Sequence, residues 1–240
     1  MTATSTASAP PADIPREAKL TLAVASLAVL AVFLDTTVLF VAFPDIVATF
    51  DTVAPAQLSW VLNAYTIVFA ALLVPAGKFA DRLGHKRAFL AGSVLFAVAS
   101  MACGLAPSAG ILIAFRVVQA VGAATLIPSS LALLLRAFPP AKVPFAVAIW
   151  GASGAVAGAL GPTLGAVLVE AASWRWVFFI NLPIGLFTVI AGRRFLHESK
   201  DETATVPAPL GVALIALAAG LVSLGLVQSE SWGWTDARTI

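Results

Sequence analysis

The sequence predicts an all-α membrane protein with about seven transmembrane helices. Apolar residues make up 60% of the 240 residues and charged residues only 11%, whereas soluble domains average roughly 25% charged residues. The apolar residues gather in runs of about twenty, the length at which a helix crosses a hydrocarbon layer of about 30 Å. Lipid is therefore the solvent in which these runs are expected to fold.

The chain begins with a polar segment and continues with seven apolar runs. Residues 1–19 are small, polar and proline-containing, and we expect a disordered cytoplasmic tail. The first apolar run exceeds the roughly 7–15 apolar residues of a signal peptide, so it is expected to remain as a span. The runs lie at about Leu20–Phe43, Leu58–Ala76, Ala88–Leu105, Ile111–Leu135, Val143–Val169, Trp176–Gly192 and Leu210–Val227.

The turn residues and the single long polar segment divide the chain. Pro44 and Pro55 fall between the first two runs, and other prolines and glycines separate the later ones. We therefore expect a six-helix bundle over residues 20–192 and a cytoplasmic linker over 193–209. A seventh transmembrane helix at 210–228 and a truncated loop at 229–240 complete this organisation.

Basic residues predict the orientation, because cytoplasmic loops carry the excess of Lys and Arg. With the N-terminus inside, the cytoplasmic segments hold 11 of the 14 basic residues. The outer loops hold only Arg175 and Arg238, and Arg116 lies within a span. These charges are spread over short loops, which argues against a nucleic-acid partner. The single cysteine, Cys103, excludes an intramolecular disulfide.

Asp35 and Arg116 are the two ionisable residues that lie well inside predicted spans. Each costs about 2.5–3.5 kcal/mol to insert at mid-membrane, so each is expected to have a partner or a role. At about 1.5 Å per residue, they lie about 13 Å and about 9 Å from the outer ends of their helices. Proton coupling is one interpretation; a structural ion pair, or an Asp35 satisfied by the hydroxyls of Thr36 and Thr37, is the other.

Gln119 lies one helical turn after Arg116 and shares its face. It could bind a substrate or hold the arginine, and the sequence leaves both open. Asn63 and Tyr65, in the second span, are expected to be helix-packing or interface residues.

The loop after the second run contains a recognisable motif. It reads Gly77-Lys-Phe-Ala-Asp81-Arg82-Leu-Gly84-His-Lys86-Arg87, which resembles the G-x-L-A-D-R-x-G-R-K signature of the major facilitator superfamily. Glycine permits close helix approach and a sharp turn, and an aspartate can accept from helix-end amides. The resemblance implies a conformational latch formed by Gly77, Asp81, Arg82, Gly84, Lys86 and Arg87. The alternative is a loop whose charges only keep it inside.

Four further stretches resemble the fourteen-helix drug:proton antiporter branch of that superfamily. They are Leu34-Asp35-Thr-Thr-Val38 through Pro44, Arg116-Val-Val-Gln119-Ala120-Val-Gly122, Gly161-Pro162-Thr-Leu-Gly165-Ala166 and Ser173–Gly185. Some positions depart from the pattern: Phe40 stands where Asn is frequent, Ala120 and Ala166 replace glycines, and His197 stands where many members have proline. None of these departures removes a charged residue of a motif.

The fifth span carries glycines at spacings of 3, 4, 3 and 4. They are Gly151, Gly154, Gly158, Gly161 and Gly165. Small residues let another helix approach closely, and Pro162 is expected to bend the helix. Generic helix packing is one explanation of this glycine pattern. The resemblance implies an antiporter motif of Gly154, Gly158, Gly161, Pro162 and Gly165 that packs on the opposite half of the transporter.

The resemblance implies proton-driven efflux, or drug:H+ antiport, of small amphipathic and often cationic compounds across the cell membrane. Asp35, Arg116 and Gln119 would serve proton coupling or substrate binding in a central cavity. The implied partners are the lipid bilayer, protons, small hydrophobic or cationic drugs, and the C-terminal half of a longer transporter. No cofactor is expected besides the proton gradient, because the sequence contains no P-loop.

Two alternatives stay open: a non-transporting fragment that only assembles with a partner half, and an exporter dedicated to one metabolite. A seven-helix receptor is disfavoured by the cytoplasmic N-terminus. A membrane enzyme is disfavoured because the spans offer one Asp, one Arg and no His.

Overall fold

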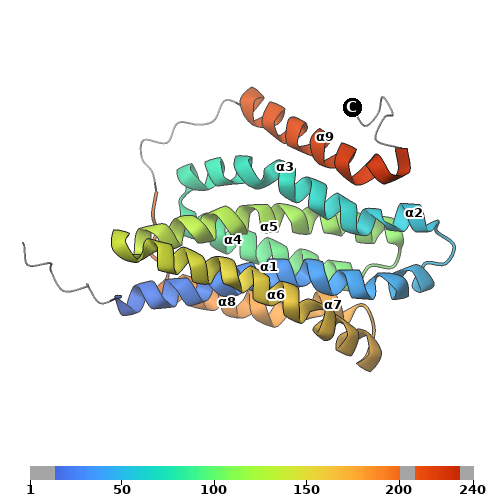
Figure 1. Ribbon diagram of the computed structural model, residues 1–240, viewed down its shortest axis with the longest axis horizontal. Coiled ribbons are helices and arrows are strands. Elements are labelled where there is room, and N and C mark those ends of the chain that lie inside the picture. Colours follow the sequence, from blue (N-terminus) through green and yellow to red (C-terminus); the bar gives the residue numbers. More distant parts are fainter. Residues whose placement is uncertain (1–13, 201–208, 233–240) are drawn as a thin grey trace, which may run out of the picture.

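The protein is all-helical in the parts that its computed structural model describes, which are residues 14–200 and 209–232 (Figure 1). Six helices in these residues are long and apolar enough to cross a membrane, which confirms the predicted fold class. In chain order the elements are α1 (Arg16–Thr49), α2 (Pro55–Leu58), α3 (Trp60–Leu83), α4 (His85–Gly104), α5 (Ala109–Ala137), η1 (Pro140–Lys142), α6 (Val143–Ala171), α7 (Trp176–Phe179), α8 (Asn181–Phe195) and α9 (Pro209–Trp232).

Helix α1 is longer than the sequence predicts at both ends. It begins at Arg16, so residues 16–19 are helical and their assignment to a disordered tail is wrong; residues 1–13 lie outside the described part. It also continues through Pro44, which was expected to end the first span. A proline removes a single backbone donor, and transmembrane helices tolerate this loss better than soluble ones.

The C-terminal elements also differ in detail from the expected organisation. The sixth run forms two successive helices, α7 and α8, and α8 extends to Phe195 into the expected linker. Helix α9 contains the predicted seventh run and packs along α3 (Figure 1). Residues 229–232, expected in a loop, belong to this helix. Residues 201–208 and 233–240, the remaining parts of the linker and the loop, lie outside the described residues.

Helices α1 and α5 form the centre of the bundle. Helix α1 packs on α5, α6 and α8, and α5 packs on α3 and α4. In the most apolar stretch of α1, 56% of the residues are buried, against 11% for the span that contains α6. The centre therefore provides the enclosed surroundings in which a polar side chain needs a partner.

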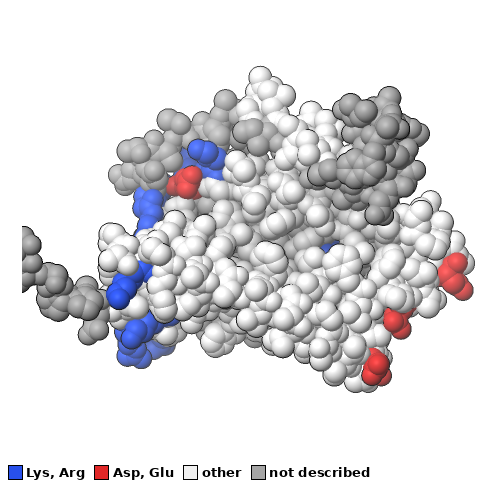
Figure 2. Space-filling model, in the orientation of Figure 1, with Lys and Arg blue, Asp and Glu red and all other residues white. Residues whose placement is uncertain are grey.

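Charged residues separate toward the two ends of the bundle. Lys and Arg side chains gather at the end where α1 begins, and acidic side chains show mainly at the opposite end (Figure 2). This separation follows from the alternating direction of the helices, because most of the basic residues lie at or just before the start of α1, α4 and α6 and at the end of α3, α5 and α8.

Candidate functional site

Asp35 of α1 and Arg116 of α5 form an ion pair inside the bundle. The Nη1 atom of Arg116 lies 2.6 Å from the Oδ2 atom of Asp35, although the two residues are 81 positions apart. Their side chains are each only 1% exposed. The two interior charges singled out in the sequence therefore neutralise one another, as burial in an apolar bundle requires.

Two amides complete the hydrogen bonding of the carboxylate. The Nε2 atom of Gln119 and the Nδ2 atom of Asn181 each donate to the Oδ1 atom of Asp35 at 2.8 Å. Gln119 also accepts from the Nη1 atom of Arg116 at 2.8 Å, so Asp35, Arg116 and Gln119 close a ring of hydrogen bonds. Gln119 thus bonds to both the Asp35 carboxylate and the Arg116 guanidinium, because it lies three residues after Arg116 on the same face of α5.

Arg116 is also fixed by helix α3. Its Nε atom donates to the carbonyl of Val61 at 3.1 Å. Its guanidinium carbon lies 4.0 Å from the centre of the Tyr65 ring, a cation–π contact. Tyr65 is therefore a packing residue, as the sequence suggests, and the group that it packs against is the buried cation.

Asn181 connects the carboxylate to a second helix pair. Its Nδ2 atom also donates to the Oγ atom of Ser100 on α4 at 3.0 Å. Ser100 in turn donates to the carbonyl of Phe178, at the junction of α7 and α8, at 2.8 Å. One asparagine side chain thus links α8 to both α1 and α4.

The carboxylate of Asp35 has more acceptor capacity than its donors use. A carboxylate offers about four lone-pair sites for hydrogen bonds, and three of them meet donors from Arg116, Gln119 and Asn181. Among the described residues, the Oδ1 atom of Asn181 has no hydrogen-bond partner although it is buried.

Both members of the pair lie in the interior of the described bundle. Asp35 and Arg116 are 2% and 1% exposed there, and a place beside a central cavity between two halves stays a prediction. They are buried because both side chains point toward other helices of the same bundle, Arg116 toward α3 and Asp35 toward α5 and α8.

The hydroxyls of Thr36 and Thr37 do not satisfy Asp35, so that alternative is wrong. Thr36 donates to the carbonyl of Val32, one turn back in α1. Thr37 donates to backbone carbonyls, among them that of Ala157 on α6 at 3.2 Å. Threonine hydroxyls in helices commonly bond to a carbonyl of the preceding turn, which leaves the carboxylate to the amides.

The glycine face of α6 divides into two sets. A Cβ atom at Gly154, Gly161 or Gly165 would lie within 3.3 Å of Phe33, Thr37 or Val38 of α1. Gly151 and Gly158 have no such neighbour within 4 Å among the described residues. Helix α1 of the same bundle therefore makes the close approach that Gly154, Gly161 and Gly165 permit. Packing on an opposite half stays a prediction, and it concerns the face of Gly151 and Gly158. Pro162 lies within α6 and is exposed.

The predicted latch lies at the basic end of the bundle. Gly84 joins α3 to α4 with a φ of 103°, a conformation that favours glycine. A Cβ atom on Gly77 would lie 3.4 Å from Pro128 of α5, and Asp81 lies 3.7 Å from the ring of His85. Arg82 and Arg87 are exposed, whereas Lys86 donates through Nζ to the carbonyl of Arg193 at 3.0 Å.

A carboxylate outside the motif binds the helix-end amides. Glu198 accepts from the backbone N–H groups of Lys86 at 3.0 Å and Arg87 at 3.3 Å, at the start of α4. The sequence assigned this chemistry to Asp81, but the segment after α8 returns to the start of α4, since the N–H of His85 donates to the carbonyl of Ser199 at 3.0 Å. A carboxylate there also meets the positive end of the helix dipole.

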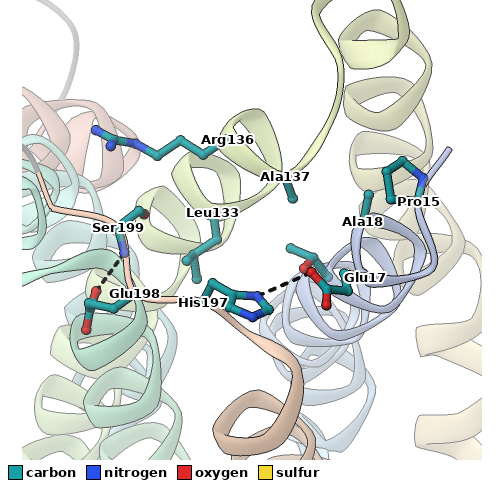
Figure 3. Close-up of a pocket in the computed structure, with 10 residues that line it drawn as sticks. Pro15, Glu17, Ala18, Leu133, Arg136, Ala137, His197, Glu198 and Ser199 are labelled. Atoms are coloured by element: carbon teal, nitrogen blue, oxygen red, sulfur yellow. Dashed lines mark hydrogen bonds and ion pairs between the residues drawn. The ribbon is translucent and has the colours of Figure 1, made fainter. Parts of the chain in front are cut away.

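The same segment borders a polar cavity of about 360 Å³ between the start of α1 and the end of α5 (Figure 3). His197 reaches across it toward Glu17, with 3.9 Å between Nδ1 and Oε2. Arg136 lies on the opposite side. Residues 197–199 therefore connect the starts of α1 and α4.

Asn181, Ser100 and Glu198 are the residues that the sequence interpretation missed. Asn181 offered a signal, because it is a polar residue within the apolar stretch from Val177 to Gly185. Ser100 offered none, since serines also occur in spans as packing residues. Glu198 lies in a polar segment where a carboxylate is unremarkable.

Residues 25–230 match the family model described as Major Facilitator Superfamily. The chain belongs to the major facilitator superfamily. It is therefore a multi-pass membrane protein, in agreement with its six membrane-length helices.

Several curated members of the superfamily are similar to this chain. The tetracenomycin C resistance and export protein of Streptomyces glaucescens is 37% identical over 92% of this chain. The methylenomycin A resistance protein of Streptomyces coelicolor is 41% identical over 93%, and the multidrug export protein EmrB of Escherichia coli K12 is 35% identical over 90%. The alignments cover 41%, 46% and 42% of these relatives, so the chain spans less than half of their length.

Solved structures support the fold alone. The human organic anion transporter MFSD10 (TETRAN) aligns with a TM-score of 0.67 at 16% identity, covering 89% of this chain and 56% of that one. The peptide transporter POT in complex with sulfate aligns with a TM-score of 0.65 at 14% identity, covering 94% and 48%.

Proposed function

We propose that the chain is the N-terminal part of a proton-coupled exporter of small amphipathic, often cationic compounds in the cell membrane. The observation that carries this proposal is the ion pair of Asp35 and Arg116, held by Gln119 and Asn181 in the interior of the bundle. Ionisable residues within membrane spans are expensive and mark proton or substrate pathways. The names of the curated relatives, which are export and resistance proteins, agree with efflux.

In the proposed mechanism Asp35 is the proton carrier. A proton on its carboxyl group removes the charge that Arg116 neutralises, and the guanidinium keeps its bonds to Gln119 and Val61. The contact between α1 and α5 weakens, and the two helices become free to shift. A proton that moves down a potential of about 100 mV releases about 2.3 kcal/mol, which would sustain roughly a fifty-fold gradient of an uncharged solute.

The proposed orientation has a cytoplasmic N-terminus. The gathering of Lys and Arg at the end of the bundle where α1 begins supports it (Figure 2). In this orientation the latch residues and Glu198 face the cytoplasm, where a second half could contact them.

Transport by alternating access requires two halves that move around a common site. The low burial of α6, 11% of its most apolar stretch, suits a surface that another helical bundle covers. A dedicated exporter is the second candidate, because two relatives are named for single antibiotics, tetracenomycin C and methylenomycin A.

The test is the replacement of Asp35 by Asn in the full-length transporter that contains this chain. Asp35→Asn keeps the size of the side chain and cannot carry the proton, so efflux of a cationic dye driven by an imposed pH gradient should be lost in proteoliposomes. Asp45→Asn, at an exposed carboxylate on the same helix, should leave efflux intact. Unchanged efflux in Asp35→Asn, at equal amounts of inserted protein, would show that Asp35 does not couple protons to efflux.

A further inference from the structure

A continuous groove runs between α4 and α8 on the outside of the bundle. It consists of two cavities, of about 350 Å³ and about 440 Å³, which share Val94, Val98 and Val189 in their walls. At its floor the two helices nearly touch, because a Cβ atom on Gly185 would lie 2.6 Å from the Cβ of Ala97. The walls are formed mainly by valine and leucine side chains, of which Val94, Val98 and Leu186 are exposed, so the groove suits a hydrocarbon chain.

The length of the groove matches half of a bilayer. It extends along α4 from Leu90 to Met101, eleven residues apart. At about 1.5 Å per residue this is about 17 Å, close to half of the roughly 30 Å hydrocarbon thickness. One acyl chain of one leaflet would therefore fill it.

The groove is charged at one end only. Arg193, which is exposed, lines it beside Leu90 and Ala91. The ammonium group of Lys86 lies at the same corner, 3.0 Å from the carbonyl of Arg193. None of the described residues that line the groove is acidic. The carboxylate of Glu198, at this end of α4, is engaged by backbone N–H groups.

The geometry points to a binding site for an anionic phospholipid in the groove between α4 and α8. Its phosphate group lies at Arg193 and Lys86, and one acyl chain follows the valines toward Met101. Basic pockets between transmembrane helices recognise anionic head groups in this way. The cations exclude a cationic drug as the occupant, and the narrow floor at Ala97 and Gly185 fits a chain rather than a helix.

Lipid retention by the purified full chain tests the site. Native mass spectrometry in detergent with added phosphatidylglycerol or phosphatidylcholine should show preferential retention of phosphatidylglycerol. Arg193→Ala should reduce that retention about fivefold, the effect of one cation near an anionic surface. Arg194→Ala, whose side chain lies over the Phe195 ring instead, should leave it unchanged.

A second variant tests the acyl chain. Val98 is 53% exposed in the groove and Val156 is 47% exposed on α6, so tryptophan at either position should not disturb the core. Val98→Trp should reduce retention of phosphatidylglycerol, and Val156→Trp should not. Equal effects of Arg193→Ala and Arg194→Ala, or of the two tryptophan variants, would overturn the proposal, as would displacement of the lipid by a cationic dye. None of these readouts depends on proton coupling at Asp35.

Discussion

Asp35 and Glu198 are two carboxylates held by hydrogen-bond donors from distant parts of the chain, in opposite surroundings. The side chain of Asp35 is 1% exposed and accepts from three side chains at 2.6–2.8 Å. The side chain of Glu198 is 37% exposed and accepts from backbone N–H groups of α4 at 3.0 Å and 3.3 Å. Glu198 is exposed enough for water to replace its donors, whereas burial shields the carboxylate of Asp35 from bulk water. The loss of a hydrogen-bond donor should therefore cost much more free energy of folding at Asp35 than at Glu198.

The largest effect is expected for Arg116→Ala, because it leaves the buried carboxylate without its cation. Removing one partner of a buried ion pair costs about 3–5 kcal/mol. The midpoint of thermal unfolding in detergent, followed by tryptophan fluorescence, should fall strongly. Arg175→Ala, which removes a half-buried arginine bound to the carbonyls of Gly104 and Ala106, should lower it less. An unchanged midpoint in Arg116→Ala would show that the ion pair of Asp35 and Arg116 contributes nothing to stability.

A smaller effect is expected for Asn181→Ala, which removes one of the three donors to Asp35. A buried polar group that loses a partner costs about 1–3 kcal/mol. The matched control is Asn63→Ala, since Asn63 is partly buried and its best contact is 3.5 Å from the Ser59 hydroxyl. The free energies of unfolding should therefore rank Asn181→Ala clearly below Asn63→Ala. The reverse order would show that the amide is incidental.

The smallest effect is expected at the exposed end. Glu198→Ala removes a cap from α4 and should cost about 1 kcal/mol, as other helix caps do. Arg87→Ala removes only the 3.7 Å ion pair with Glu198, and surface pairs contribute about 0–1 kcal/mol. Added salt should weaken the effect of Arg87→Ala and leave that of Arg116→Ala nearly unchanged. If both respond equally to salt, the two regions do not differ as described.

Helix positions were accessible from the sequence because the bilayer sets their length. All seven predicted runs lie within or close to the observed helices, and the errors fall at helix ends. Pro44 illustrates the reason: proline predicts a helix end in water, but in α1 the chain has no better way to satisfy its backbone than to continue the helix.

The site was predicted in part. Asp35, Arg116 and Gln119 could be found because charges in apolar spans are costly and helix geometry places residues 116 and 119 on one face. Asn181 lies 146 residues from Asp35, and helix periodicity contains no information on which side chains of distant helices meet. For the same reason Glu198, rather than Asp81, could not be assigned to the start of α4.

The account depends most directly on the interaction between Asp35 and Arg116, and a double-mutant cycle measures it. Asp35→Leu and Arg116→Met should each destabilise the chain by about 3–5 kcal/mol, because each leaves one buried charge unpaired. The double variant should lose much less than the sum of the two, since no charge remains inside the bundle. Additive losses in the double variant would contradict a direct, buried pairing of these two residues.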